Sequence, residues 1–352
     1  MITFSEVTKR YPDGTIAVDE LSLEIAAGKI TVLVGPSGCG KTTTLRMINR
    51  MVEPSSGSIR LDGAEISASD PPALRRRIGY VIQHGGLFPH RTVVDNVATV
   101  PYLLGWDRRK ARGRAMELLE LVGLPATFAK RYPYQLSGGQ QQRVGVARAL
   151  AADPPVMLMD EPFSAVDPVV RKSLQEELIR LQAELHKTIV FVTHDIDEAI
   201  RLGDKVCVLK VGGRIGQYDT PANLLAAPAD DFVAEFLGED RGLRRLAFLG
   251  SEGIALRTDG IVTDATPEPG HEWALVVDAE RRPVGWSFSG GSDLRPCART
   301  FTVGVDSLRS ALDSAALNPS GLAIGVDGDG RVLGVVGQSE ITQGLRIPAA
   351  TP

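Results

Sequence analysis

The segment that most constrains this chain runs from Gly35 to Thr42 and reads GPSGCGKT. It follows an apolar run, Ile30 to Val34, that predicts a strand, and it opens into Thr43 to Met51, which predicts a helix. Glycines there let backbone amides surround an anion, and the helix N-terminus adds partial positive charge. The context therefore predicts a phosphate site of the G-x-x-x-x-G-K-[ST] type. A glycine-rich surface turn is the alternative.

Two side chains of this segment have distinct roles. Lys41 is placed to neutralise β- and γ-phosphate oxygens, and the Thr42 hydroxyl is placed to ligate Mg²⁺. We expect the nucleotide contacts to come from Gly35, Pro36, Ser37, Gly38, Cys39, Gly40, Lys41, Thr42 and Thr43.

Length and composition limit the class of protein. A chain of 352 residues predicts two or more domains, and 43% hydrophobic residues suffice for packed cores. No apolar run approaches a membrane span, and the chain starts as a strand, Ile2 to Val7, without a leader. The net charge of −4 gives no electrostatic footprint for nucleic acid. Three scattered cysteines, Cys39, Cys207 and Cys297, fit a reducing compartment, so we expect a soluble cytoplasmic protein.

Acidic and histidine residues follow two further predicted strands. The run Val156 to Met159 leads into Asp160 and Glu161, and the run Thr188 to Val192 leads to His194. Such apolar runs predict strands buried in a parallel sheet, whose carboxyl ends carry ligand contacts. Asp160 is placed to hold Mg²⁺, Glu161 to orient or deprotonate an attacking water, and His194 to contact the γ-phosphate. A core histidine with satisfied hydrogen bonds is the alternative for His194.

Two single residues are weaker candidates. Residues 2–8 and 16–25 predict two strands joined by a turn, and Tyr11 stands at the entry to that turn. Tyr11 is either a half-buried aromatic residue or a ring that stacks on a base. Gln83 ends a predicted strand, Ile78 to Ile82, where ligand contacts occur in open α/β sheets, although a solvated loop residue is the alternative.

A second anion site is predicted at Leu136 to Gln140, which reads LSGGQ and precedes an apolar helix, Val144 to Leu150. Small residues with free amides at a helix start bind anions. Taken alone, Ser137 followed by glycines would be an ordinary helix cap. Two such helix starts in one chain favour the binding interpretation.

These motifs together resemble the ATPase subunit of ABC transporters, over roughly residues 1–240. The match comprises the Walker A loop GPSGCGKT, Gln83, the LSGGQ signature, the Walker B strand VMLMDE, the D-loop Ser164-Ala165-Val166-Asp167 and the switch histidine His194. The resemblance implies an α/β fold: a P-loop ABC ATPase domain with a RecA-like parallel sheet core, an N-terminal antiparallel β subdomain and a helical subdomain at about residues 84–155.

The resemblance also assigns roles in an ATP and Mg²⁺ site. The implied catalytic residues are Glu161, His194, Gln83 and Asp167. The implied magnesium ligands are Thr42, Gln83 and Asp160. Tyr11 is expected to stack on the adenine. In this family two ATPase domains pair head to tail, so the residues expected to contact ATP in trans are Ser137, Gly138, Gly139 and Gln140.

Partners follow from the same resemblance. A single set of motifs implies a homodimer with two ATP sites, and the region around Gln83 to Trp106 is expected to receive coupling helices of membrane permease subunits. An extracytoplasmic solute-binding protein would act indirectly. The implied location is the cytoplasmic face of the cell membrane, with no nucleic-acid partner.

Several segments are similar to those of importers of quaternary amines such as glycine betaine, carnitine and choline. They are residues 79–83, 86–90, 100–106 and 240–246. Three alternatives remain: the ATPase of an amino-acid importer, for example for methionine; a soluble ABC ATPase of translation or DNA repair; and a regulatory protein that uses ATP occupancy as a signal.

The composition changes after about Asp240, where lysine vanishes and glycine, aspartate and β-branched residues rise. Two segments, 272–286 and 322–336, each predict a strand, an acidic turn and a second strand, with a helix at 307–316 between them. Residues 241–352 thus resemble a tandem pair of small α+β CBS modules in degenerate form, serving regulation or dimerisation.

The residues expected to bind ribose in such modules are incomplete here. In the second repeat the hydroxyl position is Gly337, with Glu340 as the acid, whereas the first repeat offers Ser287 and Gly290 without an acid. Nucleotide binding by the tail is therefore disfavoured.

Overall fold

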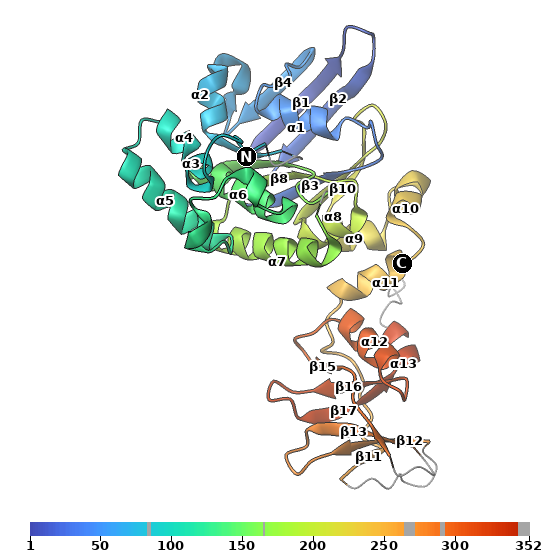
Figure 1. Cartoon of the computed structure of the whole chain (residues 1–352). Helices are drawn as coiled ribbons and strands as arrows, with labels where there is room; N and C mark the ends of the chain where they lie inside the picture. The colour runs from blue at the N-terminus through green and yellow to red at the C-terminus, as the bar shows by residue number, and fades with distance from the viewer. Residues whose placement is uncertain (83–85, 165, 264–271, 289–292, 344–352) are drawn as a thin grey trace. The chain divides into compact units, whose positions relative to one another are not determined.

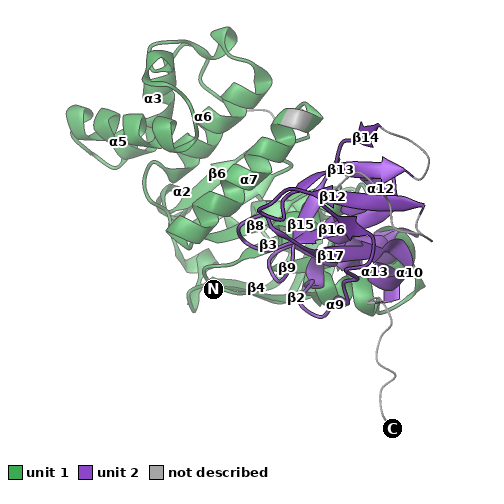
Figure 2. Ribbon diagram, turned by 90° about the horizontal axis from the view of Figure 1, so that it is seen from below, with its two compact units in different colours: residues 1–236 green, residues 237–352 purple. Residues whose placement is uncertain are grey.

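The computed structural model describes residues 1–82, 86–164, 166–263, 272–288 and 293–343. The chain divides into two compact units, Met1–Phe236 and Leu237–Pro352, which Figure 2 distinguishes by colour. Each unit has its own sheets, and they are described in turn. None of the helices in the described ranges combines the length and apolar character needed to cross a bilayer.

The first unit is organised around a six-stranded sheet, drawn in the centre of its ribbon in Figure 1. In spatial order the strands are β10 (Ile215–Asp219), β9 (Lys205–Leu209), β3 (Ile30–Val34), β8 (Thr188–Val192), β7 (Val156–Asp160) and β6 (Ile78–Val81). Strands β3, β7 and β8 are buried at every residue, which explains their continuous apolar sequences. The expected parallel arrangement holds for five strands, whereas the edge strand β10 runs antiparallel to β9.

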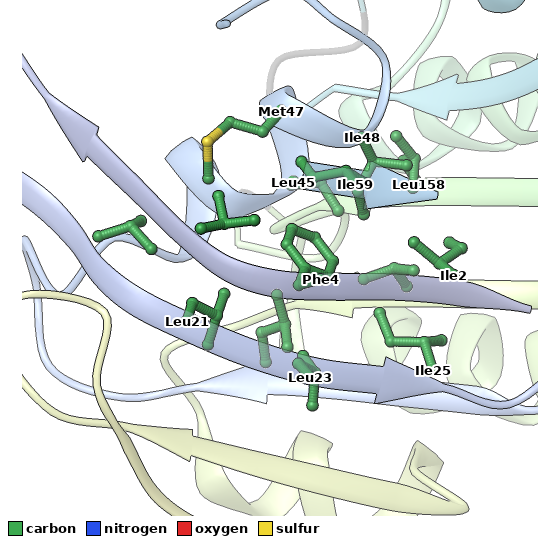
Figure 3. Packing of buried hydrophobic residues seen from close by; sticks show 14 of the residues in the cluster. Ile2, Phe4, Leu21, Leu23, Ile25, Leu45, Met47, Ile48, Ile59 and Leu158 are labelled. Atoms are coloured by element: carbon green, nitrogen blue, oxygen red, sulfur yellow. The ribbon is translucent and has the colours of Figure 1, made fainter. Parts of the chain in front are cut away.

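An antiparallel sheet, ordered β2-β1-β4-β5, forms the N-terminal part of this unit. Its strands are β1 (Ile2–Arg10), β2 (Ile16–Ile25), β4 (Ser56–Leu61) and β5 (Ala64–Glu65). The two N-terminal strands that the sequence predicts are confirmed. Figure 3 shows Phe4 and Ile59 of this sheet beside Leu45 and Ile48 of helix α1 (Lys41–Ile48), all of them members of one buried cluster. The sheet thus shares its core with the helix that follows the phosphate loop.

A group of helices lies between β6 and β7 in the chain: α3 (Val93–Val97), α4 (Thr99–Leu103), α5 (Arg108–Leu121) and α6 (Gly138–Leu150). Helices α3, α5 and α6 pack against one another. Helix α6 begins at Gly138, earlier than the apolar pattern from Val144 indicates, because the Ser137 side chain caps its first turn.

The remaining helices of the unit are short, apart from α7. They are α2 (Pro71–Arg76), α7 (Pro168–Leu185), α8 (Ile196–Leu202), α9 (Pro221–Ala226) and α10 (Asp231–Leu237). Helix α7 starts directly after the D-loop, and α8 starts at Ile196, after the capping residue Asp195 that follows His194.

The second unit begins with α11 (Arg241–Arg245) and contains two sheets. One comprises β11 (Ile261–Val262), β12 (Trp273–Val277), β13 (Pro283–Phe288) and β14 (Leu294–Arg295). The other comprises β15 (Thr300–Thr302), β16 (Leu322–Val326) and β17 (Val332–Gly337). Helices α12 (Leu308–Leu317) and α13 (Gln338–Gln343) follow β15 and β17.

The two hairpins of this unit have the same register. Leu275 pairs with Trp286 in the first, and about fifty residues later Ile324 pairs with Val335 in the second. Each hairpin has its register shift at the same place, and each has a parallel strand added beside its first strand. Both hairpins also contribute to one buried cluster. The internal repeat that the sequence predicts is therefore confirmed.

Candidate active site

The glycine-rich loop joins β3 to α1, as its sequence predicts. Gly40 has a φ of +97°, and a Cβ at this position would overlap the carbonyl oxygen of Ala17 on β2. A Cβ at Gly35 would overlap the carbonyl oxygen of Leu209 on β9. Two neighbouring strands thus fix the loop, and only glycine fits at both contacts.

Lys41 is nearly buried, at 6% exposure. Its Nζ donates to the carbonyl oxygens of Gly35, at 2.8 Å, and Pro36, at 2.9 Å. These carbonyls belong to the loop itself and are neutral, so they do not cancel the positive charge of the ammonium. Among the residues that the structure describes, no side chain caps the N-terminus of α1, which begins at the same residue. The residues therefore fit an anion such as a nucleotide phosphate.

Asp160, at the end of β7, lies against the first turn of α1. The Thr42 hydroxyl donates to Asp160 Oδ1 at 2.9 Å, and the Tyr80 hydroxyl donates to Oδ2 at 3.4 Å. Burial raises the pKa of the Asp160 carboxyl above its ordinary value. A hydroxyl and a carboxylate within hydrogen-bond distance of each other are a donor set that suits Mg²⁺. Thr42 and Asp160 therefore fit the predicted metal site, and Gln83, the third predicted ligand, lies outside the described residues.

Glu161 and His194 meet across two strand ends. Nδ1 of His194 lies 3.2 Å from Oε2 of Glu161. The Glu161 amide donates to the carbonyl of Val192, at 3.0 Å, which fixes the backbone between β7 and β8. Glu161 also has a φ of +43°, an uncommon conformation for a non-glycine residue that recurs at functional sites. The His194 side chain is 62% exposed, so it is not a core histidine.

These groups open onto one cleft of about 470 Å³. Its lining residues are Ala17, Ser37, Gly38, Gly40, Lys41, Thr42, Thr43, Glu161 and His194. The structure thus brings the loop, the acidic residue and the histidine together. Cys39 is different, because its side chain is fully buried and burial raises the pKa of its thiol. Its side chain therefore packs in the core, and only its backbone can face a ligand.

Tyr11 lies near this cleft, since its hydroxyl is 3.4 Å from the Thr43 hydroxyl. The Lys9 ammonium lies 5.3 Å from the centre of the Tyr11 ring. The tyrosine is half-buried beside the residue that follows the loop. Both interpretations of its role are compatible with this position.

The signature residues do not line this cleft. The Ser137 hydroxyl accepts from the Gln140 amide at 3.3 Å, and the Gln140 side chain accepts from the Ser137 amide at 3.0 Å. This reciprocal pair forms a capping box at the exposed start of α6. Gly138 and Gly139 lie in the same turn, Gly138 exposed and Gly139 half-buried. Within one subunit the two predicted anion sites are therefore separate.

The D-loop, residues 164–167, lies between β7 and α7 in the chain. The Ser164 hydroxyl donates to the Glu161 carbonyl at 3.0 Å, and the Asp167 carbonyl accepts from the Arg171 amide at 2.7 Å. Asp167 is exposed and is not part of the cleft lining. Ala165 lies outside the described residues.

The sequence interpretation missed three residues beside the site. Tyr80 reaches Asp160 because β6 pairs with β7, and no local pattern signals that pairing. Arg46 lies 4.0 Å from Asp160 and one helical turn after Thr42, a spacing that could have identified it. Ala17 lines the cleft through a β2 contact that only the fold reveals.

Comparisons with known proteins agree with this geometry. The family model described as "ABC transporter" matches residues 18–164. The osmoprotectant import ATP-binding protein OsmV of Salmonella typhimurium is 43% identical over 98% of this chain and 96% of its own length. The choline transport ATP-binding protein OpuBA of Bacillus subtilis is 56% identical over 68% of this chain. That match spans 63% of the length of OpuBA, which is less than two thirds of it.

A solved structure is also similar. It is the dimeric, post-hydrolysis form of the ATP-binding cassette MJ0796 bound to ADP and Pi. It is 35% identical, with a TM-score of 0.57, and the similarity covers 63% of this chain and 99% of that one. The match to OsmV extends over nearly the whole of both chains. The chain therefore belongs to the ABC transporter family of ATP-binding proteins.

Proposed function

We propose that this chain is the ATP-hydrolysing subunit of an ABC importer for osmoprotectants of the quaternary-amine class. The observation that carries the proposal is the cleft beside the phosphate loop, where Lys41, Glu161 and His194 come together. The names of the relatives OsmV and OpuBA supply the solute class, because no residue of an ATPase subunit touches the solute.

The side chains divide the work of hydrolysis. Lys41, which donates to the carbonyls of Gly35 and Pro36 here, would donate to phosphate oxygens of a bound nucleotide, and Thr42 and Asp160 would hold Mg²⁺. When bound, Mg²⁺ neutralises charge on the phosphate oxygens. Glu161 accepts a proton from the attacking water, and His194 contacts the γ-phosphate while its Nδ1, 3.2 Å from Oε2 of Glu161, orients that carboxylate. We assign Gln83 as the third Mg²⁺ ligand and, together with Asp167, as a catalytic residue in the same reaction.

We further propose that two copies pair head to tail, so that each completes the other's site. The start of α6 lies outside the cleft of its own subunit, and the exposed Ser137 and the half-buried Gly139 there are the residues that we assign to a partner's site. Gly138 and Gln140 lie in the same turn. The dimeric form of MJ0796 is a precedent in a related cassette. ATP would then favour the closed pair, and hydrolysis would favour the open one.

The partners in the membrane are permease subunits on the cytoplasmic face, served indirectly by an extracytoplasmic solute-binding protein. We assign their docking to the region from Gln83 to Trp106, which includes α3 and α4. The exposed side chains of Phe88, Leu103 and Leu104 lie there and offer apolar contact area.

The domain assignment extends the same proposal. We place the ATPase domain at 1–240, its helical subdomain at about 84–155 and a regulatory or dimerising region at 241–352. The β-α-β-β-α order from β15 to α13 supports degenerate CBS-like modules in that region.

Nucleotide binding by that region is disfavoured. Ser287 is 2% exposed, so its hydroxyl faces the core. The Glu340 carboxylate accepts from the neighbouring Ser339 hydroxyl at 2.9 Å, and Gly290 lies outside the described residues.

The rival assignments are weaker. A ferredoxin-like tail, which would favour an amino-acid importer, is disfavoured because the two hairpins lie in separate sheets. A soluble ABC ATPase would typically contain a second cassette or a coiled-coil insertion, and the motifs here occur once. A regulatory protein that binds ATP as a signal without hydrolysing it would not need the Glu161–His194 pair.

The test is uptake of labelled glycine betaine, carnitine or choline by vesicles that contain this chain and its neighbouring permease. We expect uptake that requires ATP and that increases from low to high internal salt. Normal ATP hydrolysis with no uptake of any of the three would refute the solute class. Salt dependence that persists after removal of residues 246–352 would refute the regulatory role of the tail.

A further inference from the structure

A buried carboxylate, Glu198, contacts the residue that precedes the catalytic histidine and has no part in the reaction described above. It belongs to the first turn of α8 and is 6% exposed. Its Oε2 accepts from the Thr193 hydroxyl at 2.7 Å, and its Oε1 accepts from the Gln175 amide at 3.2 Å. Burial raises the pKa of this carboxyl. A buried charge is costly, and the two hydrogen bonds, with the Arg171 guanidinium 4.0 Å away, offset that cost.

Thr193 links this carboxylate to the histidine. Its hydroxyl donates to Glu198 and also accepts from the Asp195 amide at 3.0 Å. Its own amide donates to the Leu33 carbonyl of β3 at 3.2 Å. The residues on both sides of His194 are therefore anchored, whereas the His194 side chain itself is largely exposed. The backbone contacts of Thr193 and Asp195 fix the position of the His194 backbone, from which the imidazole extends.

Helix α7 connects the same cluster to the D-loop. Arg171 and Gln175 lie one turn apart on this helix, and Gln175 is 6% exposed. The Arg171 guanidinium donates to the Val166 carbonyl at 3.2 Å and lies 3.7 Å from the Asp195 carboxylate. Its Nε lies 4.0 Å from Glu198 and has no hydrogen-bond partner among the described residues. The histidine turn and the D-loop thus share one cluster centred on Glu198.

We propose that Glu198 is a positioning residue for ATP hydrolysis: through Thr193 it holds the backbone of His194 so that the imidazole meets Glu161. The inference rests on the proposed function, since it concerns hydrolysis at the same cleft. The alternative is that Glu198 only secures α8 against α7. The two roles differ in what they predict for turnover and for substrate binding.

The first comparison uses Glu198→Gln and a matched control, Glu176→Gln. The control removes a surface carboxylate that pairs with Arg201, 2.9 Å away, across the same two helices. In the full-length protein we expect Glu198→Gln to lower kcat by about tenfold or more, because small displacements of catalytic groups are costly. The KM for ATP should stay within about threefold, since Glu198 does not contact the phosphate loop. Glu176→Gln should change neither value.

The second comparison covers the case in which Glu198→Gln fails to fold. Thr193→Ser keeps the hydroxyl between Glu198 and Asp195, whereas Thr193→Val keeps the size and removes it. We expect turnover near that of the parent for Thr193→Ser, and a loss similar to that of Glu198→Gln for Thr193→Val. A merely structural role predicts that kcat per folded molecule is equal in the two variants.

The inference is overturned if Glu198→Gln retains kcat within about twofold, or if Thr193→Val turns over as fast as Thr193→Ser. Uptake is measured in parallel with the parent protein. Hydrolysis without uptake would refute the importer assignment and leave both comparisons of turnover unaffected.

Discussion

Replacing Glu161 with glutamine tests the assignment of the residue that activates water. Glutamine has the same size, so the cleft keeps its shape and the amide oxygen can keep the 3.2 Å contact with His194. The φ of +43° at this position is equally unfavourable for both residues, so the substitution adds no backbone strain. The change is thus confined to the loss of a proton acceptor.

The expected loss of kcat follows, because only the proton acceptor is removed. Losing a general base alone lowers kcat by about a hundredfold to ten-thousandfold, or about 2.7 to 5.4 kcal/mol of barrier. ATP affinity should change little, because Lys41, Thr42 and Asp160 provide the phosphate and metal contacts that we propose. ATP should therefore remain bound and hold the dimer closed.

The assay is phosphate release under saturating ATP and Mg²⁺, combined with size-exclusion chromatography. The control is Glu184→Gln, which makes the same chemical change at an exposed residue that pairs with Arg180. The reasoning is refuted if Glu161→Gln retains more than about a tenth of the parent turnover, or if Glu184→Gln loses as much.

Three further outcomes are expected. Lys41→Ala should abolish tight ATP binding in calorimetry, because it removes the buried cation of the loop; binding at parental affinity would contradict its role. Burial raises the pKa of Asp160 in the folded state, so the folded state binds the Asp160 proton more tightly than the unfolded chain does. The contribution of this group to the free energy of unfolding therefore falls as pH rises. Asp160→Asn should thus increase the free energy of unfolding at pH 7, with a gain that shrinks as pH falls towards about 3.9, the pKa of unfolded aspartate; a pH-independent gain would contradict this. Trp286→Ala should destabilise the second unit by about 3 to 5 kcal/mol, because Trp286 is 1% exposed, while hydrolysis by the first unit persists; loss of hydrolysis in folded protein would show coupling between the units.

Local patterns predicted much of the fold. The continuous apolar runs at Ile30–Val34 and Val156–Met159 are buried strands of the central sheet, and glycines mark the turn before α1. The pattern around Val144 placed the start of α6 too late, because the glycines that carry the capped first turn have low helix propensity. The antiparallel edge strand β10 was not expected, although the short connection from β9, which contains Gly212 and Gly213, is a local signal of an antiparallel hairpin that could have identified it.

The site was predictable where its residues lie in short motifs. The loop from Gly35 to Thr42, together with Glu161 and His194, was identified, and these residues meet at one cleft. The partners that support them were not, because Tyr80, Glu198 and Gln175 reach the site through tertiary packing. A glutamate in the first turn of a short helix looks like a solvated residue until its burial is known.

The most direct test of the central claim, an ATP site completed by a second subunit, mixes two inactive variants. Lys41→Ala removes the loop cation, and Gly139→Asp places a negative charge in the first turn of α6, where Gly139 is half-buried and a Cβ would lie 3.1 Å from a methyl group of Val170. Each variant alone should be inactive. After subunit exchange at equal amounts, half of the dimers should contain one intact site, so hydrolysis should recover to about a quarter of the parent rate. Full activity of Gly139→Asp alone, or no recovery when exchange is verified by labelled subunits, would contradict the shared site.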